Sequence, residues 1–204
     1  MLYDLNNISV KAREITADDL DKAVIALKKD NNLIGAGQYF IDTQEKYDIN
    51  AIVLLAMACL ESGFGNSKLA REKNNLFGIH ANDSLKGTAN YGDYFATKED
   101  CVDFAGYKLR KQYLELDKKA SWCYADGNTD IWSIGEIWSS NPKWGDLIED
   151  LCERLTKNID VEEVEPEIDY KKKYFEAMDY IAQIRNITDK AELKAEMEIP
   201  NDEY

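Results

Sequence analysis

The sequence is poor in the residues that build metal sites. It has one histidine, His80, and its four cysteines show no C-x-x-C pair. Because the usual zinc site takes Cys and His ligands, this supply predicts neither a metal site nor a cofactor, and it argues against a zinc amidase. A Cys/His peptidase is also disfavoured, since it needs a reactive cysteine close to a histidine. Cys59 and Cys101 fall on apolar helical positions and are expected to be buried thiols.

Basic residues and long apolar runs are scarce as well. The chain has 25 Lys and Arg against 39 Asp and Glu, which gives a net charge of −14. Phosphate binding needs clustered Lys and Arg, so no nucleic-acid partner is expected, and simple charge attraction to an anionic cell wall is disfavoured. The longest apolar run, around residues 51–60, is shorter than the roughly 20 residues that span a bilayer, so no membrane partner is expected.

Apolar and aromatic residues are present in the amounts that a packed globular domain needs, at 45% and 11% of the chain. The length of 204 residues allows one domain of about 150 residues plus an extension. We expect an N-terminal arm at 1–14, a main domain at 15–159, an acidic linker at 160–169 and a helical C-terminal extension at 170–204. The apolar stripe of the extension allows it to pack on the main domain or to bind a virion or another protein partner.

The main domain is predicted to be α+β and mainly helical. Helix starts are indicated by capping residues at three places: Thr16 with Asp19, Asp48 or Asn50, and Asn66 or Ser67. A helix is expected over 98–116. Between residues 82 and 97, two glycines and alternating aromatics predict a small β lobe.

Glu61 is the most informative residue. It ends the apolar stretch 48–61, which is hydrophobic on every face and therefore predicts a buried helix. Gly63 and Gly65 follow, and they let backbone approach whatever Glu61 faces. Burial disfavours the charged form of a carboxyl, so such a group can keep its proton near neutral pH and give it to a leaving oxygen.

Three short blocks follow one another at the end of this helix: Leu-Glu-Ser-Gly-Phe-Gly at 60–65, Ser-Lys-Leu-Ala at 67–70 and Asn-Asn-Leu-Phe-Gly-Ile at 74–79. Together they resemble the core motif of the glucosaminidases of glycoside hydrolase family 73, over residues 15–159. The resemblance implies a lysozyme-like fold and a peptidoglycan hydrolase that acts on bacterial glycan strands. It also implies that Glu61 is the general acid at the β-1,4 bond between N-acetylglucosamine and N-acetylmuramic acid.

The sequence leaves the second catalytic group open. A second carboxylate commonly assists glycoside cleavage, and Asp83 and Asp93 are the local acids. Asp83 resembles the aspartate of family members with a short lobe, although a turn-capping role is the favoured interpretation. Tyr91 or Tyr94 can supply a phenol instead, and the substrate's own N-acetyl group can assist in some glycosidases.

The family also offers a tyrosine in a C-terminal Tyr-Ala-Thr-Asp-Pro motif. The matching segment here is Trp-Ser-Ser-Asn-Pro-Lys-Trp, with Trp138 and Trp144 at the aromatic positions. An indole has an N–H donor and no hydroxyl, so a tyrosine-assisted mechanism at these two positions is in doubt.

Aromatic faces pair with the apolar faces of sugar rings. The predicted substrate-binding residues therefore come from the motif and from the aromatic residues of the segments expected to line the groove: Asn75, Phe77, Tyr94, Trp138 and Trp144. Core packing is the favoured alternative for Phe77 and an equal one for Trp138.

Two further expectations concern location and activity. The start of the chain, Met1–Val10, has neither a basic flank nor an apolar stretch, so no secretory signal is predicted there. Either the chain is a mature fragment, or an enzyme acting outside the cell on the wall leaves by another route, as phage lysins and virion-associated hydrolases do. The alternative to an enzyme is a catalytically silent lysozyme-like module that binds cell wall or builds a phage tail.

Overall fold

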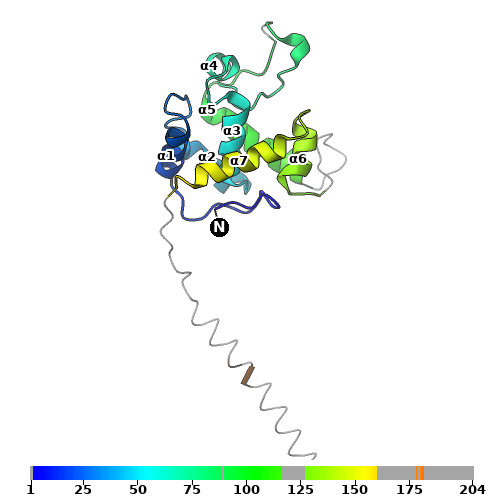
Figure 1. The fold of residues 1–204 in the computed structure, drawn as a ribbon. Coiled ribbons are helices and arrows are strands. Elements are labelled where there is room, and N and C mark those ends of the chain that lie inside the picture. The colour runs from blue at the N-terminus through cyan, green and yellow to red at the C-terminus, as the bar shows by residue number, and fades with distance from the viewer. Residues whose placement is uncertain (1, 89, 116–126, 160–177, 179, 182–204) are drawn as a thin grey trace, which may run out of the picture. The chain divides into compact units, whose positions relative to one another are not determined.

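The computed structural model describes residues 2–88, 90–115, 127–159, 178, 180 and 181 (Figure 1). The chain divides into two compact units, Met1–Val161 and Glu162–Tyr204. Helices α1 to α7 all belong to the first unit, which also carries the candidate site. The predicted linker and nearly all of the predicted extension lie outside the described residues, so both stay predictions.

The first unit is organised around α3, Ala51–Ser62. Every residue of this helix from Ala51 to Cys59 is buried, as the all-apolar pattern predicted. Asn50 is the cap, because its side chain accepts hydrogen bonds from the backbone N–H groups of Ile52 and Val53 at 3.0 and 3.2 Å. The same amide donates to two carbonyls of the N-terminal arm, which fixes the arm against the start of α3.

Two helices pack on α3, namely α2 (Gly37–Tyr47) and α7 (Trp144–Thr156), and α1 (Ala17–Leu27) packs on both of these. The most extensive contact of α3 is with α7, and Figure 1 shows α7 crossing α3 between α1 and α6 (Ile131–Trp138). The predicted capping box begins α1: Thr16 and Asp19 exchange hydrogen bonds between their side chains and backbone N–H groups.

The remaining elements follow the motif residues. Ser67 caps the short helix α4, Lys68–Lys73, by accepting from the backbone N–H of Ala70. The helix expected over 98–116 is two elements, α5 at Lys98–Lys108 and a π-helical turn at Leu109–Leu114. The wider π turn changes which side chains face inward, and it buries Tyr113 at the edge of the site.

The small β lobe is not confirmed. In the described part of the chain no strand is assigned, and the segment 82–97 has a 3-10 turn, Asp83–Leu85, followed by bends. Isolated hydrogen bonds tie it to the core, from Asp93 N to Ile79 O at 3.0 Å and from Phe95 N to Lys73 O at 2.9 Å. A strand needs a ladder of such bonds, and the positive φ of Gly87 and Gly92 turns the backbone before one forms.

Two other expectations concern the described residues. Cys59, Cys101 and Cys152 are buried free thiols, while Cys123 lies outside the description. Among the helices that are described, none has the length and apolar character needed to cross a membrane.

Candidate active site

Glu61 lies in the last turn of α3, and the chain turns away immediately after it. Gly63 ends the helix in the left-handed conformation (φ 59°), which a residue with a Cβ adopts at a cost. The Ser62 hydroxyl donates back to the carbonyl of Ala58 and accepts from the backbone N–H of Gly65 at 2.6 Å. The sharp turn is thus held from inside, and Glu61 is left half-buried at the mouth of the buried helix.

Two indole rings hold one oxygen of Glu61. The Nε1 of Trp144 donates to Oε1 at 2.7 Å, and the Nε1 of Trp138 donates to the same oxygen at 3.2 Å. Trp138 is the last residue of α6 and Trp144 the first of α7, and their rings stack with centroids 6.2 Å apart. The turn between the two helices therefore brings both donors to one acceptor.

Close packing of α6 against α7 sets the position of the Trp144 ring. A Cβ at Gly135 would lie 2.8 Å from Cε3 of Trp144, so only glycine leaves room for the indole at this point of α6. Trp144 is buried and has little freedom to move. The donor at 2.7 Å is consequently placed by the core and not by a mobile surface side chain.

Burial raises the pKa of Glu61 above its ordinary value, and the hydrogen bonds from Trp144 and Trp138 oppose that rise in part. Because an indole N–H only donates, Oε1 must act as an acceptor in both protonation states. When Glu61 is protonated, its proton therefore sits on Oε2. This oxygen faces Gly78, where an added Cβ would lie 3.8 Å away. The site can present a carboxylic acid with its proton on a known oxygen.

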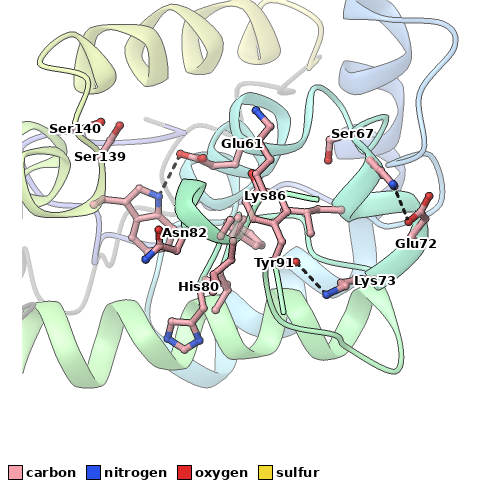
Figure 2. A pocket seen from close by; sticks show the side chains of 18 of the residues that line it. Glu61, Ser67, Glu72, Lys73, His80, Asn82, Lys86, Tyr91, Ser139 and Ser140 are labelled. Carbon is pink, nitrogen blue, oxygen red and sulfur yellow. Dashed lines mark hydrogen bonds and ion pairs between the residues drawn. The ribbon is translucent and has the colours of Figure 1, made fainter. Parts of the chain in front are cut away.

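Glu61 opens on a groove of about 1430 Å³. One wall comes from α6 and the residues after it, and the opposite wall from α4 and the loop that follows Phe77. Figure 2 shows Glu61 and Lys86 near the middle of the groove, with Ser139 and Ser140 to one side and Ser67 and Glu72 to the other. Lining residues therefore lie on both sides of Glu61, as the site of a polymer substrate requires.

The structure brings several predicted site residues together in this groove. Phe77, Tyr91 and Trp138 all line it with Glu61. The Lys73 ammonium donates to the carbonyl of Tyr91 at 3.0 Å and fixes that part of the loop against α4. Trp138 both lines the groove and touches the acid.

Other predicted residues lie elsewhere. Trp144 is behind the acid, outside the groove lining, and Tyr94 is 69% exposed and also outside it. Asn75 is buried, and its amide holds Ile79 from both sides, accepting from its N–H at 2.9 Å and donating to its carbonyl at 3.0 Å. Asp83 starts the 3-10 turn, and its side chain is outside the description. Substrate or catalytic roles for these four residues stay predictions.

The second acid has few candidates among the described residues. Asp93 Oδ2 lies 2.8 Å from Nδ1 of His80, and Asp93 is not in the groove lining. Within that lining, Glu72 is the one acid besides Glu61, and it lies 3.9 Å from Lys68 on its own helix. Clusters of three or more Asp, Glu, His or Cys that could hold a metal ion are not found among the described residues.

Tyr113 and Lys86 are among the lining residues that sequence reasoning missed. Tyr113 is buried and packs its ring on Trp138 with centroids 5.6 Å apart. It lies in the π-helical turn, and the periodicity of an α-helix does not predict which side chains such a turn buries. Lys86 lies beside Gly87, and that glycine was the available signal that a turn brings this segment back toward the site.

A half-buried carboxyl whose pKa is raised by burial, placed in a groove lined by aromatic rings, is the arrangement of a glycoside hydrolase. Comparison with known proteins defines the family. Residues 37–157 match the Glucosaminidase family, described as mannosyl-glycoprotein endo-β-N-acetylglucosaminidase, and the chain belongs to this family.

Curated relatives agree with this assignment. A protein of Streptococcus pneumoniae serotype 4, provisionally named as an endo-β-N-acetylglucosaminidase, is 30% identical over 155 residues, which cover 73% of this chain and 22% of that protein. The exo-glucosaminidase LytG of Bacillus subtilis is 39% identical over 66 residues, 28% of this chain and 23% of LytG. The chain thus spans about a fifth of the length of these relatives.

Solved structures support the fold. A catalytic mutant of S. aureus autolysin E, in complex with the disaccharide NAG-NAM, has a TM-score of 0.58 at 21% identity. The match covers 77% of this chain and 74% of that one. A second structure of the same autolysin, with the muropeptide NAM-L-Ala-D-iGlu, has a TM-score of 0.57 over the same shares.

Proposed function

We propose that this protein hydrolyses peptidoglycan at the β-1,4 bond between N-acetylglucosamine and N-acetylmuramic acid, with Glu61 as the general acid. Family membership supports the reaction class, and the autolysin complex with NAG-NAM supports this disaccharide as the substrate unit. The observation that carries the role of Glu61 is its pair of indole donors on one oxygen in a half-buried position.

The proposed step uses the unshared oxygen. Oε1 is held by the indoles, so Oε2 gives its proton to the glycosidic oxygen as the bond breaks. The carboxylate that results is stabilised by the two N–H donors already in place, and no solvent has to reorganise around it. Its pKa, raised by burial, keeps a fraction of Glu61 protonated at pH values where an exposed glutamate is ionised.

The opposite face of the sugar needs a stabilising group. Among the described lining residues, Glu72 is paired with a lysine, whereas Tyr91 and Tyr113 add phenol rings to the groove. We propose that the substrate's own N-acetyl group or one of these phenols takes this part, and not a second carboxylate.

The test is digestion of purified peptidoglycan by the wild type and by Glu61→Gln, with reduced products identified by mass spectrometry. New reducing-end N-acetylglucosamine is expected from the wild type, and a loss of about 10²- to 10⁴-fold in rate from the variant. Glutamine has nearly the same shape, so an unchanged melting temperature is the control for folding.

Two results would contradict the proposal. Reducing-end N-acetylmuramic acid would assign the other linkage of the strand. Binding of the wall without new reducing ends, from either protein, would favour the silent binding module.

A further inference from the structure

The groove differs in charge from the rest of the molecule. The chain as a whole carries −14. The described residues that line the groove include four lysines and two glutamates: Lys68, Lys73, Lys86, Lys108, Glu61 and Glu72. One of the two acids is Glu61, which burial holds toward its neutral form. The surface that a substrate meets is therefore basic, although the composition is acidic.

Three of these lysines help to build the walls. Lys68 lies 3.9 Å from an acid on its own helix, and Lys73 donates to two backbone carbonyls of the loop at 3.0 and 2.9 Å. Lys108 is buried, and its ammonium donates at 2.9 Å to a glutamine one turn further along. The ammonium groups of these three lysines are therefore engaged in contacts within the protein.

Lys86 is different. It is exposed in the turn that follows the 3-10 helix Asp83–Leu85, and it lines the groove. Within the parts of the chain that are described, its ammonium makes no hydrogen bond or ion pair. Figure 2 shows it near the middle of the groove, in the same part of the view as Glu61. An ammonium in this position is available to an anion on a bound molecule.

The chemistry of the substrate says where such an anion can be. N-acetylglucosamine is neutral, so the glycan has no acid on that residue. N-acetylmuramic acid carries a lactyl group, which is either a free carboxylate or the attachment point of a peptide whose residues carry carboxylates. A cation in the groove therefore distinguishes the muramyl side of the chain from the glucosamine side.

We infer that Lys86 binds a carboxylate on the muramyl substituent and makes the groove selective for strands that keep this acid free. The inference rests on the proposed function, because it takes peptidoglycan as the ligand. It deepens that function by naming the feature of the wall that the loop recognises. An exposed ion pair contributes modestly, so the expected preference is up to about fivefold.

The test is a binding measurement that does not depend on turnover. Full-length Glu61→Gln protein is titrated by calorimetry with GlcNAc-MurNAc-L-Ala-D-isoglutamate and with the same compound carrying isoglutamine. These probes differ in one carboxylate only. We expect the acid form to bind about fivefold more tightly, a preference that Lys86→Ala removes and Lys86→Arg largely keeps.

Two further probes identify which carboxylate Lys86 binds. Stem-free GlcNAc-MurNAc has a free lactyl carboxylate, and chitobiose has none. A preference for the first that disappears in Lys86→Ala assigns the lactyl group, whereas a preference confined to the isoglutamate probe assigns the peptide. Either pattern supports the inference.

Lys29→Ala is the matched control, because Lys29 is exposed, carries the same charge and lies outside the groove lining. The inference is overturned when Lys86→Ala weakens every probe equally, when it weakens none, or when Lys29→Ala has the same effect. Selective binding without hydrolysis by the wild type would contradict the proposed function alone. Hydrolysis without selectivity would contradict this inference alone.

Discussion

The two walls of the groove are built in different ways. The wall at α6 is backed by the core: Trp144, at the start of α7, is buried against α6, and Gly135 leaves its ring no spare room. The loop wall is a series of turns, exposed over most of 82–88, and is tied to the core by single hydrogen bonds. The helical wall fixes the geometry of Glu61, whereas the loop wall presents the exposed side chains that we propose meet the substrate.

This division has a physical reason. A general acid must hold its proton at one place to within a fraction of an ångström, and close-packed helices provide that precision. To select for a substituent, a side chain must extend to it, but its exact position matters less. A loop can supply such a side chain, because a loop tolerates changes of sequence at little cost to the fold. The comparison predicts that substitutions in the two walls change different measured quantities.

Asn75→Ala is the largest expected change in stability, because Asn75 joins the loop wall to the core. Its buried amide satisfies the N–H and C=O of Ile79 and donates to the carbonyl of Asp93 at 3.1 Å. Removing it leaves the buried N–H of Ile79 unpaired, at about 1–3 kcal/mol, and also takes one hydrogen bond each from the carbonyls of Ile79 and Asp93. We expect the free energy of unfolding to fall by about 3 kcal/mol, measured by chemical denaturation.

Asn82→Ala is the control for that variant. Asn82 makes its side-chain bonds to Ser84 at an exposed position, so its loss should cost less than about 0.5 kcal/mol. Equal losses from the two asparagines would show that the loop is not anchored at Asn75.

Trp144→Phe tests the helical wall. It keeps a ring but removes the donor at 2.7 Å from Glu61 Oε1. A hydrogen bond to a charged group contributes about 1.5–3 kcal/mol, so we expect the plateau of kcat/KM to fall at least about tenfold. The bond favours the carboxylate, so its loss should raise the pKa of Glu61 further. The basic limb of the pH profile, where the acid loses its proton, should therefore move to higher pH.

Trp132→Phe is the matched control on the neighbouring helix, α6. Its indole N–H also donates to a carboxylate, Asp146 at 3.0 Å, but Trp132 does not line the groove. It should leave the pH profile in place. A downward shift of the basic limb in Trp144→Phe would contradict the assigned hydrogen bond.

Gly135→Ala asks whether the core positions the Trp144 ring. In most helices this change stabilises, by about 0.5–1 kcal/mol. Here the new Cβ would meet Cε3 of Trp144 at 2.8 Å. Overpacking costs about 1–3 kcal/mol, so we expect a net loss of about 1 kcal/mol together with reduced activity. Ser133→Ala, on the same helix, should change neither the melting temperature nor the rate appreciably.

Part of this arrangement could be predicted from the sequence. Glu61 was found because an apolar run ending in one acid and two glycines is a local pattern. The capping box at Thr16 and the cap at Ser67 were local too. The pair of indole donors was not predicted, since their partner lies 77 and 83 positions away along the chain. Tyr113 was missed because the π turn shifts the helical register.

The β lobe, in contrast, is a feature that the sequence predicted and the structure does not confirm. Alternating aromatics and glycines in 82–97 predicted strands, but periodicity alone says nothing about a partner strand. In the structure, the positive φ of Gly87 and Gly92 turns the backbone at these two residues, so it does not stay extended as a strand does. What the pattern did report is that this segment returns to the core, and Tyr91 does lie in the groove.

Asp93→Asn has the smallest expected effect, and it bears on the second catalytic group. Asp93 pairs with the exposed His80 and stays outside the groove lining, so the substitution removes a surface interaction worth less than about 1 kcal/mol. We expect kcat/KM on peptidoglycan to stay within about threefold of the wild type. A loss approaching that of Glu61→Gln would instead make Asp93 the second carboxylate. It would also mean that the loop wall supplies chemistry as well as selectivity.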